Sequence, residues 1–321
     1  MRALWLLLVF IALARAPASA QSQASDEMFT NAAVAKGITI GRSGCAVLER
    51  QETAVWVEVE GKGACLRYYA AGLTRGGPNP VAAGWFHGDI LGTKPTSIGH
   101  QEGLGVTAMI GQSNRLAERH AVPFVFFGRP GSYGSAGLAW TTRHRPIEAA
   151  LMNAALDAVK ARYRIAHWAL GGHSAGGQLV AEFLARRDDV RCAVLSSGPV
   201  AYRAYLQARR LTHLLASPER WYDPYDSVGK IPADPERRVF VIGDPRETNV
   251  PFETQALYAK ALKAHGHAAW LVPLERAPAP RFHNLVDFGE AATGACAHGR
   301  TTGDILEMLA AMPAQSDRIS N

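Results

Sequence analysis

Hydrophobic residues follow two patterns along this chain. Over residues 38–69 apolar and polar residues alternate in short stretches, as in residues 54–59, which predicts antiparallel strands with one face in water. Beyond them lie compact apolar runs, most separated from the next by a helix-length segment, as is typical of parallel strands covered on both faces. These runs are residues 81–86, 122–127, 166–170, 192–195, 239–242 and 269–272.

Helical spacing of apolar residues fills several of the intervening segments. It is clear over residues 147–163, 178–186 and 252–265. Strands that alternate with helices predict an α/β fold, with a mostly parallel central sheet, helices on both faces and antiparallel strands at its N-terminal side. The alternation stops over residues 199–235, which we interpret as a small helical, cap-like insertion.

The N-terminal residues predict an export signal. Arg2 precedes an apolar run over residues 3–14 that is too short to span a bilayer, and Ala-Ser-Ala at 18–20 suits a signal peptidase. We expect a signal peptide over residues 1–20, cleavage after Ala20, and one secreted or periplasmic domain over residues 21–321. An uncleaved anchor or a buried helix is the alternative. We expect no stable membrane insertion, because no other segment of the sequence is long and apolar enough to cross a bilayer.

The charge of the chain is mild. Its formal net charge is +6, and the basic residues are scattered as short pairs, such as Arg186-Arg187 and Arg237-Arg238, with acids nearby. This arrangement is typical of a solvated surface rather than a nucleic-acid interface. We therefore expect no nucleic-acid partner.

Four cysteines suit an oxidising compartment. Cys45 and Cys65 flank a predicted hairpin and form one candidate disulfide, and Cys192 and Cys296 form a second. Other pairings stay open, as does a free buried thiol at Cys192. There is no Cys-x-x-Cys pair, so we expect neither a zinc site nor another metal or cofactor.

One motif carries chemistry. Ser174 lies in a Gly-x-Ser-x-Gly frame between the apolar run 166–170 and the predicted helix 178–186. A serine on a sharp strand-to-helix turn needs small neighbours, and Gly172 and Gly176 supply them. The pattern predicts a nucleophile elbow, in which Ser174 requires a histidine base and a carboxylate that orients the histidine.

Taken in order, these segments resemble an α/β-hydrolase-fold serine hydrolase, of the esterase or prolyl oligopeptidase-like branch, over most of the mature length. In that family the order is serine, acid, histidine. The resemblance implies Glu247, three residues before Val250, as the acid. Because aspartate is usual there, Asp244 stays an alternative.

The resemblance also implies the base. His283 lies in the loop after the last apolar run, where the family has its catalytic histidine. His298 is its main rival.

The same resemblance implies an oxyanion hole. Its donors would be the backbone N–H of Ala175 and that of Gly88 or Asp89, in the His-Gly loop after residues 81–86. Arg129, in a glycine-rich loop, is expected to be structural.

We therefore expect an exported serine hydrolase that acts on carboxylic esters through an acyl-enzyme on Ser174, without a cofactor. The alternatives are a prolyl oligopeptidase-like peptidase acting on small peptides and a non-catalytic binding protein that keeps the fold. The expected partner is a small ester or small peptide substrate.

Overall fold

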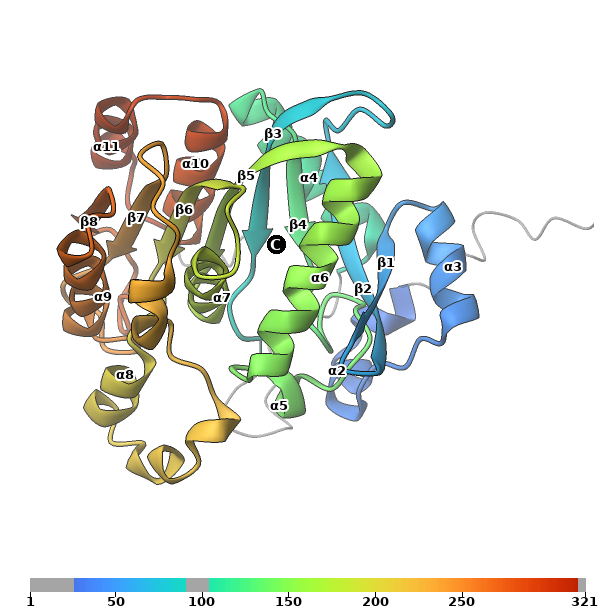
Figure 1. Cartoon of the computed structure of the whole chain (residues 1–321), viewed down its shortest axis with the longest axis horizontal. Helices are drawn as coiled ribbons and strands as arrows, with labels where there is room; N and C mark the ends of the chain where they lie inside the picture. Colours follow the sequence, from blue (N-terminus) through green and yellow to red (C-terminus); the bar gives the residue numbers. More distant parts are fainter. Residues whose placement is uncertain (1–25, 91–103, 317–321) are drawn as a thin grey trace, which may run out of the picture.

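The computed structural model describes residues 26–90 and 104–316, and its core is an eight-stranded sheet (Figure 1). The predicted signal peptide and its cleavage site lie outside these residues. The strands are β1 (Ala54–Val59), β2 (Lys62–Ala71), β3 (Asn79–Phe86), β4 (Phe124–Phe127), β5 (Ile165–His173), β6 (Val190–Ser196), β7 (Arg238–Gly243) and β8 (Ala269–Pro273).

The strand order is β1-β2-β4-β3-β5-β6-β7-β8. Only β2 runs against its neighbours, pairing antiparallel with β1 and β4, and every other pair is parallel. The prediction of a mostly parallel sheet with antiparallel pairing at its N-terminal side is confirmed. Parallel strands are covered on both faces, so their apolar residues form continuous runs that are visible in the sequence.

Helices cover both faces of the sheet and bury two separate cores. One core contains residues of α6 (Pro146–Tyr163), α7 (Ala175–Leu184) and α9 (Phe252–Ala264). The other contains residues of α4 (Val106–His120), α10 (Val286–Ala297) and α11 (Thr302–Ala311). Figure 1 shows α6 crossing the front of the sheet beside α7. None of the helices in the described ranges is long and apolar enough to cross a membrane.

The prediction of strands from residue 38 onward is wrong in its first part. Residues Arg42–Arg50 form helix α3, which packs against β1. Cys45 and Leu48 are its buried residues, and their spacing of three places both on one helical face. Short stretches preceding it form η1 (Glu27–Phe29) and α2 (Asn31–Lys36).

The segment 199–235 is helical, as predicted. It contains α8 (Tyr202–Ala208) and the 3-10 helices η2 (Thr212–Ala216), η3 (Pro218–Arg220) and η4 (Pro224–Lys230). The carboxylate of Asp223 accepts hydrogen bonds from the backbone N–H groups of Tyr202 and Arg203, each at 2.8 Å. Because these N–H groups belong to the first turn of α8, which has no internal partners for them, this carboxylate holds the segment together.

One more short helix, α5 (Ala139–Thr142), lies directly before α6.

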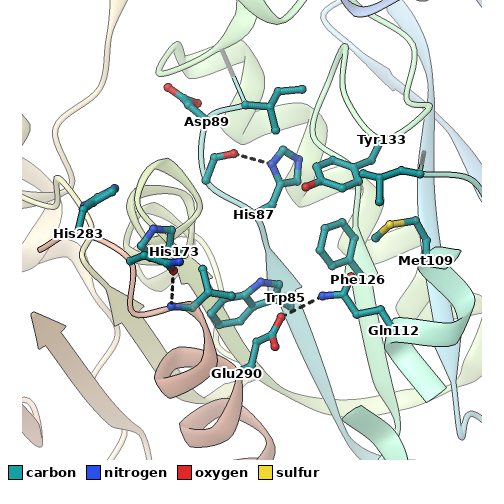
Figure 2. Close-up of a pocket in the computed structure, with 15 residues that line it drawn as sticks. Trp85, His87, Asp89, Met109, Gln112, Phe126, Tyr133, His173, His283 and Glu290 are labelled. Carbon is teal, nitrogen blue, oxygen red and sulfur yellow. Dashed lines mark hydrogen bonds between the residues drawn. The ribbon is translucent and has the colours of Figure 1, made fainter. Parts of the chain in front are cut away.

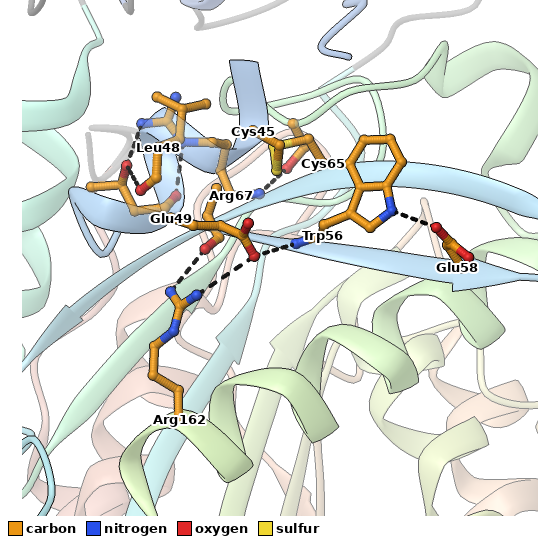
Figure 3. Close-up of a disulfide and its surroundings, with 11 residues drawn as sticks. Cys45, Leu48, Glu49, Trp56, Glu58, Cys65, Arg67 and Arg162 are labelled. Atoms are coloured by element: carbon orange, nitrogen blue, oxygen red, sulfur yellow. Dashed lines mark hydrogen bonds and ion pairs between the residues drawn. A yellow bond between two sulfur atoms is a disulfide. The ribbon is translucent and has the colours of Figure 1, made fainter. Parts of the chain in front are cut away.

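Two disulfides each join a helix to a strand of the sheet. Cys45 on α3 is bonded to Cys65 on β2 (Figure 3), and Cys192 on β6 is bonded to Cys296 on α10. These are the two pairings considered first from the sequence, and Cys192 is not a free thiol. The first ties the N-terminal helix to the sheet, and the second ties the C-terminal helices to its centre.

The two disulfides should differ in their effect on stability. They close segments with sequence separations of 20 and 104 residues, for which chain entropy predicts about 3 and about 5 kcal/mol, respectively. We expect Cys192→Ala/Cys296→Ala to lower the free energy of unfolding, measured in urea, by more than Cys45→Ala/Cys65→Ala does. An equal or reversed order would contradict the loop-closure explanation.

Candidate active site

Ser174 lies on the turn between β5 and α7, in a conformation that non-glycine residues seldom adopt. Its φ is 53° and its ψ is −123°, which is strained for an L-amino acid. Its backbone N–H donates to the Ser196 carbonyl oxygen at 2.8 Å, and its own carbonyl accepts from the Gln178 N–H at 3.2 Å. These two bonds hold the strained residue at both of its peptide groups.

Close backbone packing explains the two glycines of the motif. A Cβ atom on Gly176 would lie 2.1 Å from the Phe86 carbonyl oxygen, and one on Gly172 would lie 2.4 Å from the Gly176 carbonyl carbon. Any side chain at either position would push α7 away from β3 or β5. The two glycines are therefore required by the packing of α7 on the sheet as well as by the turn at Ser174.

Glu247 and His283 are in direct contact. The Nδ1 atom of His283 forms a short hydrogen bond with Oε1 of Glu247, which also accepts from the Val250 N–H at 2.9 Å. Gln255 donates to the other carboxylate oxygen at 3.0 Å. Burial raises the pKa of Glu247, and the hydrogen bond from His283 is the largest effect that lowers it. The buried carboxylate is thus held by three partners.

Asp244 has a different set of partners. It is fully buried, and its carboxylate accepts hydrogen bonds from the backbone and guanidinium of Arg246 and from the Ala277 N–H. Burial raises the pKa of Asp244, but the bonds from Arg246 and Ala277 outweigh it, and the net direction is downward. Of the two acids considered from the sequence, the structure brings Glu247 to His283 and uses Asp244 to brace the loop.

His283 lies beside the residue that precedes Ser174. Its ring is 4.7 Å from the ring of His173, centroid to centroid. Burial, and secondarily the charge of His283, keep the pKa of His173 well below its ordinary value, so His173 is a neutral neighbour. Among the described residues the Ser174 hydroxyl has no hydrogen-bond partner, and such contacts often close only when substrate binds. His298 lines a separate cavity with His120 and Arg300.

The predicted oxyanion loop is in contact with Ser174. A Cβ atom on Gly88 would lie 3.1 Å from the Ser174 Cβ, which is closer than most Cβ contacts, so glycine allows this approach without a shift of its neighbours. The next residue, Asp89, continues the loop, and Ala175 opens α7 directly after Ser174.

His87 fixes the orientation of this loop. Its Nε2 accepts the Arg129 N–H at 3.2 Å, so the ring proton is on Nδ1, which donates to the Gly88 carbonyl oxygen at 2.6 Å. Burial, then the Arg129 charge, lower the pKa of His87 to about 3, so the ring stays neutral. Because a trans peptide is planar, holding the Gly88 C=O toward His87 turns the Asp89 N–H to the opposite side.

Arg129 joins the charged groups behind the loop. Its guanidinium pairs with Glu148 at 2.8 Å and with Asp89 at 3.0 Å. His144 contacts Asp89 at 3.1 Å and Gln178 at 2.6 Å. This network connects the oxyanion loop to α6 and α7, which agrees with the structural role expected for Arg129.

A cavity of about 290 Å³ opens beside this site. His173, His283 and Gly88 line one part, and most of the rest is lined by apolar and aromatic residues (Figure 2). Those apolar and aromatic lining residues include Trp85, Leu104, Met109, Phe126, Tyr133 and Val286. This cavity thus provides a largely apolar binding slot next to His283.

Two polar side chains in this slot escaped the sequence analysis. Glu290 on α10 is 5% exposed, and Gln112 on α4 donates to its Oε1 at 3.2 Å. Burial, followed by the charge of Asp287, raises the pKa of Glu290 to about 8, against smaller opposing effects of Arg119, Gln112 and Arg115. Glu290 is the only acidic residue among the small and apolar residues 288–297, and this was the signal in the sequence that could have indicated it.

No group of three or more His, Cys, Asp or Glu side chains in the described ranges is arranged to hold a metal ion.

Comparisons with known proteins relate the fold to solved structures. No protein-family model matches the chain, and no curated protein matches it. The esterase Est1E of Butyrivibrio proteoclasticus, solved with ferulic acid bound, aligns with a TM-score of 0.52 and 16% identity, over 77% of this chain and 99% of that one. The esterase Pf2001 of Pyrococcus furiosus aligns with a TM-score of 0.51 and 15% identity, over 84% and 96%.

A peptidase is similar to the same extent. Oligopeptidase B of Leishmania major aligns with a TM-score of 0.54 and 15% identity, over 76% of this chain but 36% of its own length. At these identities the similarity shows the fold. The chain has the α/β-hydrolase fold that esterases and oligopeptidases share.

Glu290 should make the stability of the protein depend on pH. Its pKa is about 8 in the folded protein against an ordinary 4.5. Between these values only the unfolded chain loses the proton, so this group's stabilising contribution is complete below pH 4.5 and is lost as the pH rises to 8. We expect Glu290→Gln to show a smaller loss of unfolding free energy from pH 5 to pH 8. Glu253→Gln, an exposed control on α9, should behave like wild type; an unchanged profile in Glu290→Gln would contradict the prediction.

Proposed function

We propose that this protein is an exported serine hydrolase that cleaves carboxylic esters through an acyl-enzyme on Ser174. The observation that carries the proposal is the placement of Ser174 on a strained turn, against the Gly88 loop, with the His283–Glu247 pair packed on the adjacent His173. This is the set of groups that acyl transfer to a serine requires.

In the first half of the reaction, the Ser174 Oγ attacks the ester carbonyl carbon while Nε2 of His283 takes its proton. Glu247 holds the proton on Nδ1, which leaves Nε2 free to act as the base. The carbonyl oxygen becomes negatively charged and accepts hydrogen bonds from the backbone N–H groups of Ala175 and of Asp89 or Gly88. When the tetrahedral intermediate collapses, His283 gives its proton to the departing alkoxide, and the alcohol leaves.

In the second half, water attacks the acyl carbon of the ester on Ser174. His283 accepts a proton from the water and returns it to the serine oxygen as the acid is released. Each proton thus passes through one imidazole, and no cofactor is needed. The neutral His87 keeps the oxyanion loop in place through both steps, because it carries no charge of its own to change.

Export is supported by the disulfides. Both pairs of cysteines are bonded and no cysteine of the described residues is free, which is typical of proteins from oxidising compartments. A signal peptide over residues 1–20 with cleavage after Ala20 remains part of this proposal.

A peptidase acting on small peptides is the second candidate. The similarity to oligopeptidase B favours it, together with the position of Glu247 three residues before Val250. Turnover of p-nitrophenyl acyl esters, compared with proline-containing aminoacyl amides, separates the two. Amide turnover with negligible ester turnover would reject the esterase.

Ser174 should be the residue that reacts. We expect a fluorophosphonate probe to label the wild-type protein and mass spectrometry to place the adduct on Ser174. Ser174→Ala should abolish both labelling and ester turnover, since no other hydroxyl replaces the nucleophile. Ser135→Ala is the matched control, because the Ser135 hydroxyl is engaged with Gly128 and Arg67; it should still be labelled. An unlabelled wild-type protein would support a non-catalytic binding protein instead.

Substitutions of Glu247 and of Asp244 should have different effects on kcat. Glu247→Gln should reduce kcat by about a thousandfold or more, because the amide no longer stabilises the imidazolium or sets its tautomer. Asp244→Asn should keep kcat within about tenfold of wild type and lower the melting temperature, since Asp244 braces the loop through Arg246. A large loss of kcat in Asp244→Asn alone would transfer the role to that residue.

A further inference from the structure

The cavity beside His283 has a buried carboxyl group that the proposed mechanism does not use. Glu290 forms no ion pair with any lysine or arginine in the described ranges, and its single hydrogen bond there is the one from Gln112. Burying a carboxyl group that has no ion-pair partner makes the free energy of folding less favourable. It lines the cavity together with Gln112, rather than lying behind the cavity wall.

The shape of the slot favours a flat apolar group. Trp85 and Phe126 come from the neighbouring strands β3 and β4, and Tyr133 comes from the loop after β4. Figure 2 shows Glu290 beside Trp85, and Gln112 beyond it on the side away from His283. Aromatic walls pack well against another aromatic ring. A ring attached to an ester held at Ser174 would therefore bring its outer edge toward the polar pair Glu290 and Gln112, which lies among the aromatic lining residues.

We propose that Glu290 and Gln112 determine specificity by binding a hydroxyl group on the outer edge of an aromatic ring carried by the ester. This inference rests on the proposed esterase function. The pair would donate a hydrogen bond to the hydroxyl oxygen and accept one from its proton.

The chemistry of the pair favours a neutral hydroxyl over a charged group. Burial raises the pKa of Glu290 to about 8, so near neutral pH the protonated carboxyl both donates and accepts, as the Gln112 amide does. An ammonium group would require a buried ionised carboxylate, and a carboxylate would meet few donors and no paired cation. A hydroxyl group matches both halves of the pair.

The test uses matched esters that differ by one hydroxyl group. Methyl 3-(4-hydroxyphenyl)propanoate is compared with methyl 3-phenylpropanoate, and 2-(4-hydroxyphenyl)ethyl acetate with 2-phenylethyl acetate, which places the ring on either side of the cleaved bond. We expect kcat/KM to favour the hydroxylated ester by about tenfold or more in one series. In Glu290→Leu this ratio should fall toward one, whereas Glu290→Gln, which keeps a donor and an acceptor, should retain most of it.

Control variants separate specificity from folding. Glu307→Leu removes an exposed glutamate from α11 and should leave the ratio at its wild-type value. If Glu290→Leu does not fold, Gln112→Leu tests the same pair and should lower the ratio as well.

Three outcomes would overturn the proposal. The first two are the absence of a hydroxyl preference in both series and a preference that survives Glu290→Leu. The third is a preference, abolished in Glu290→Gln, for the same esters with an aminomethyl group in place of the hydroxyl group, which would assign a cation as the ligand instead. Failure of the esterase function is recognised separately, by the absence of fluorophosphonate labelling and of turnover of all four esters.

Discussion

The strained turn at Ser174 is the constraint on which the rest of the site depends. A positive φ at a serine costs free energy, which the surrounding packing must offset. Here the Ser196 carbonyl holds the turn from β6, and the close approach of Gly172 and Gly176 seats α7 on the sheet. Gly88 brings the predicted oxyanion loop against the turn. The central strands and their buried residues therefore form a rigid support for one partly buried serine.

Buried polar groups around this turn are arranged in separate sets with different tasks. Glu247 is satisfied by His283, Val250 and Gln255, and the Arg129 network is satisfied by its own acids. The Glu247–His283 pair and the loop at Gly88 are therefore held by different partners. Glu290 differs, since its only bond among the described residues is to a neutral amide.

Several features of the site were readable from the sequence because their signals are local. The turn around Ser174 combines an apolar run, small residues and a helix within residues 166–186. The acid was narrowed to Asp244 and Glu247 but not resolved, because both lie in one loop, three residues apart. Only the fold decides which carboxylate faces His283, and Arg246 contributes by engaging Asp244.

What the sequence by itself determined is the succession of the parallel strands with three of their helices, the glycine-flanked turn at Ser174, the helical insertion and two candidate cysteine pairs, since period and motif are carried by neighbouring residues. The tertiary structure decided what depends on distant residues meeting. It made residues 42–50 a helix, where short alternation was misleading, and it joined Cys192 to Cys296. It also brought Glu290 of α10 to Gln112 of α4 across the cavity. Contacts between residues more than a hundred positions apart leave no local pattern to read.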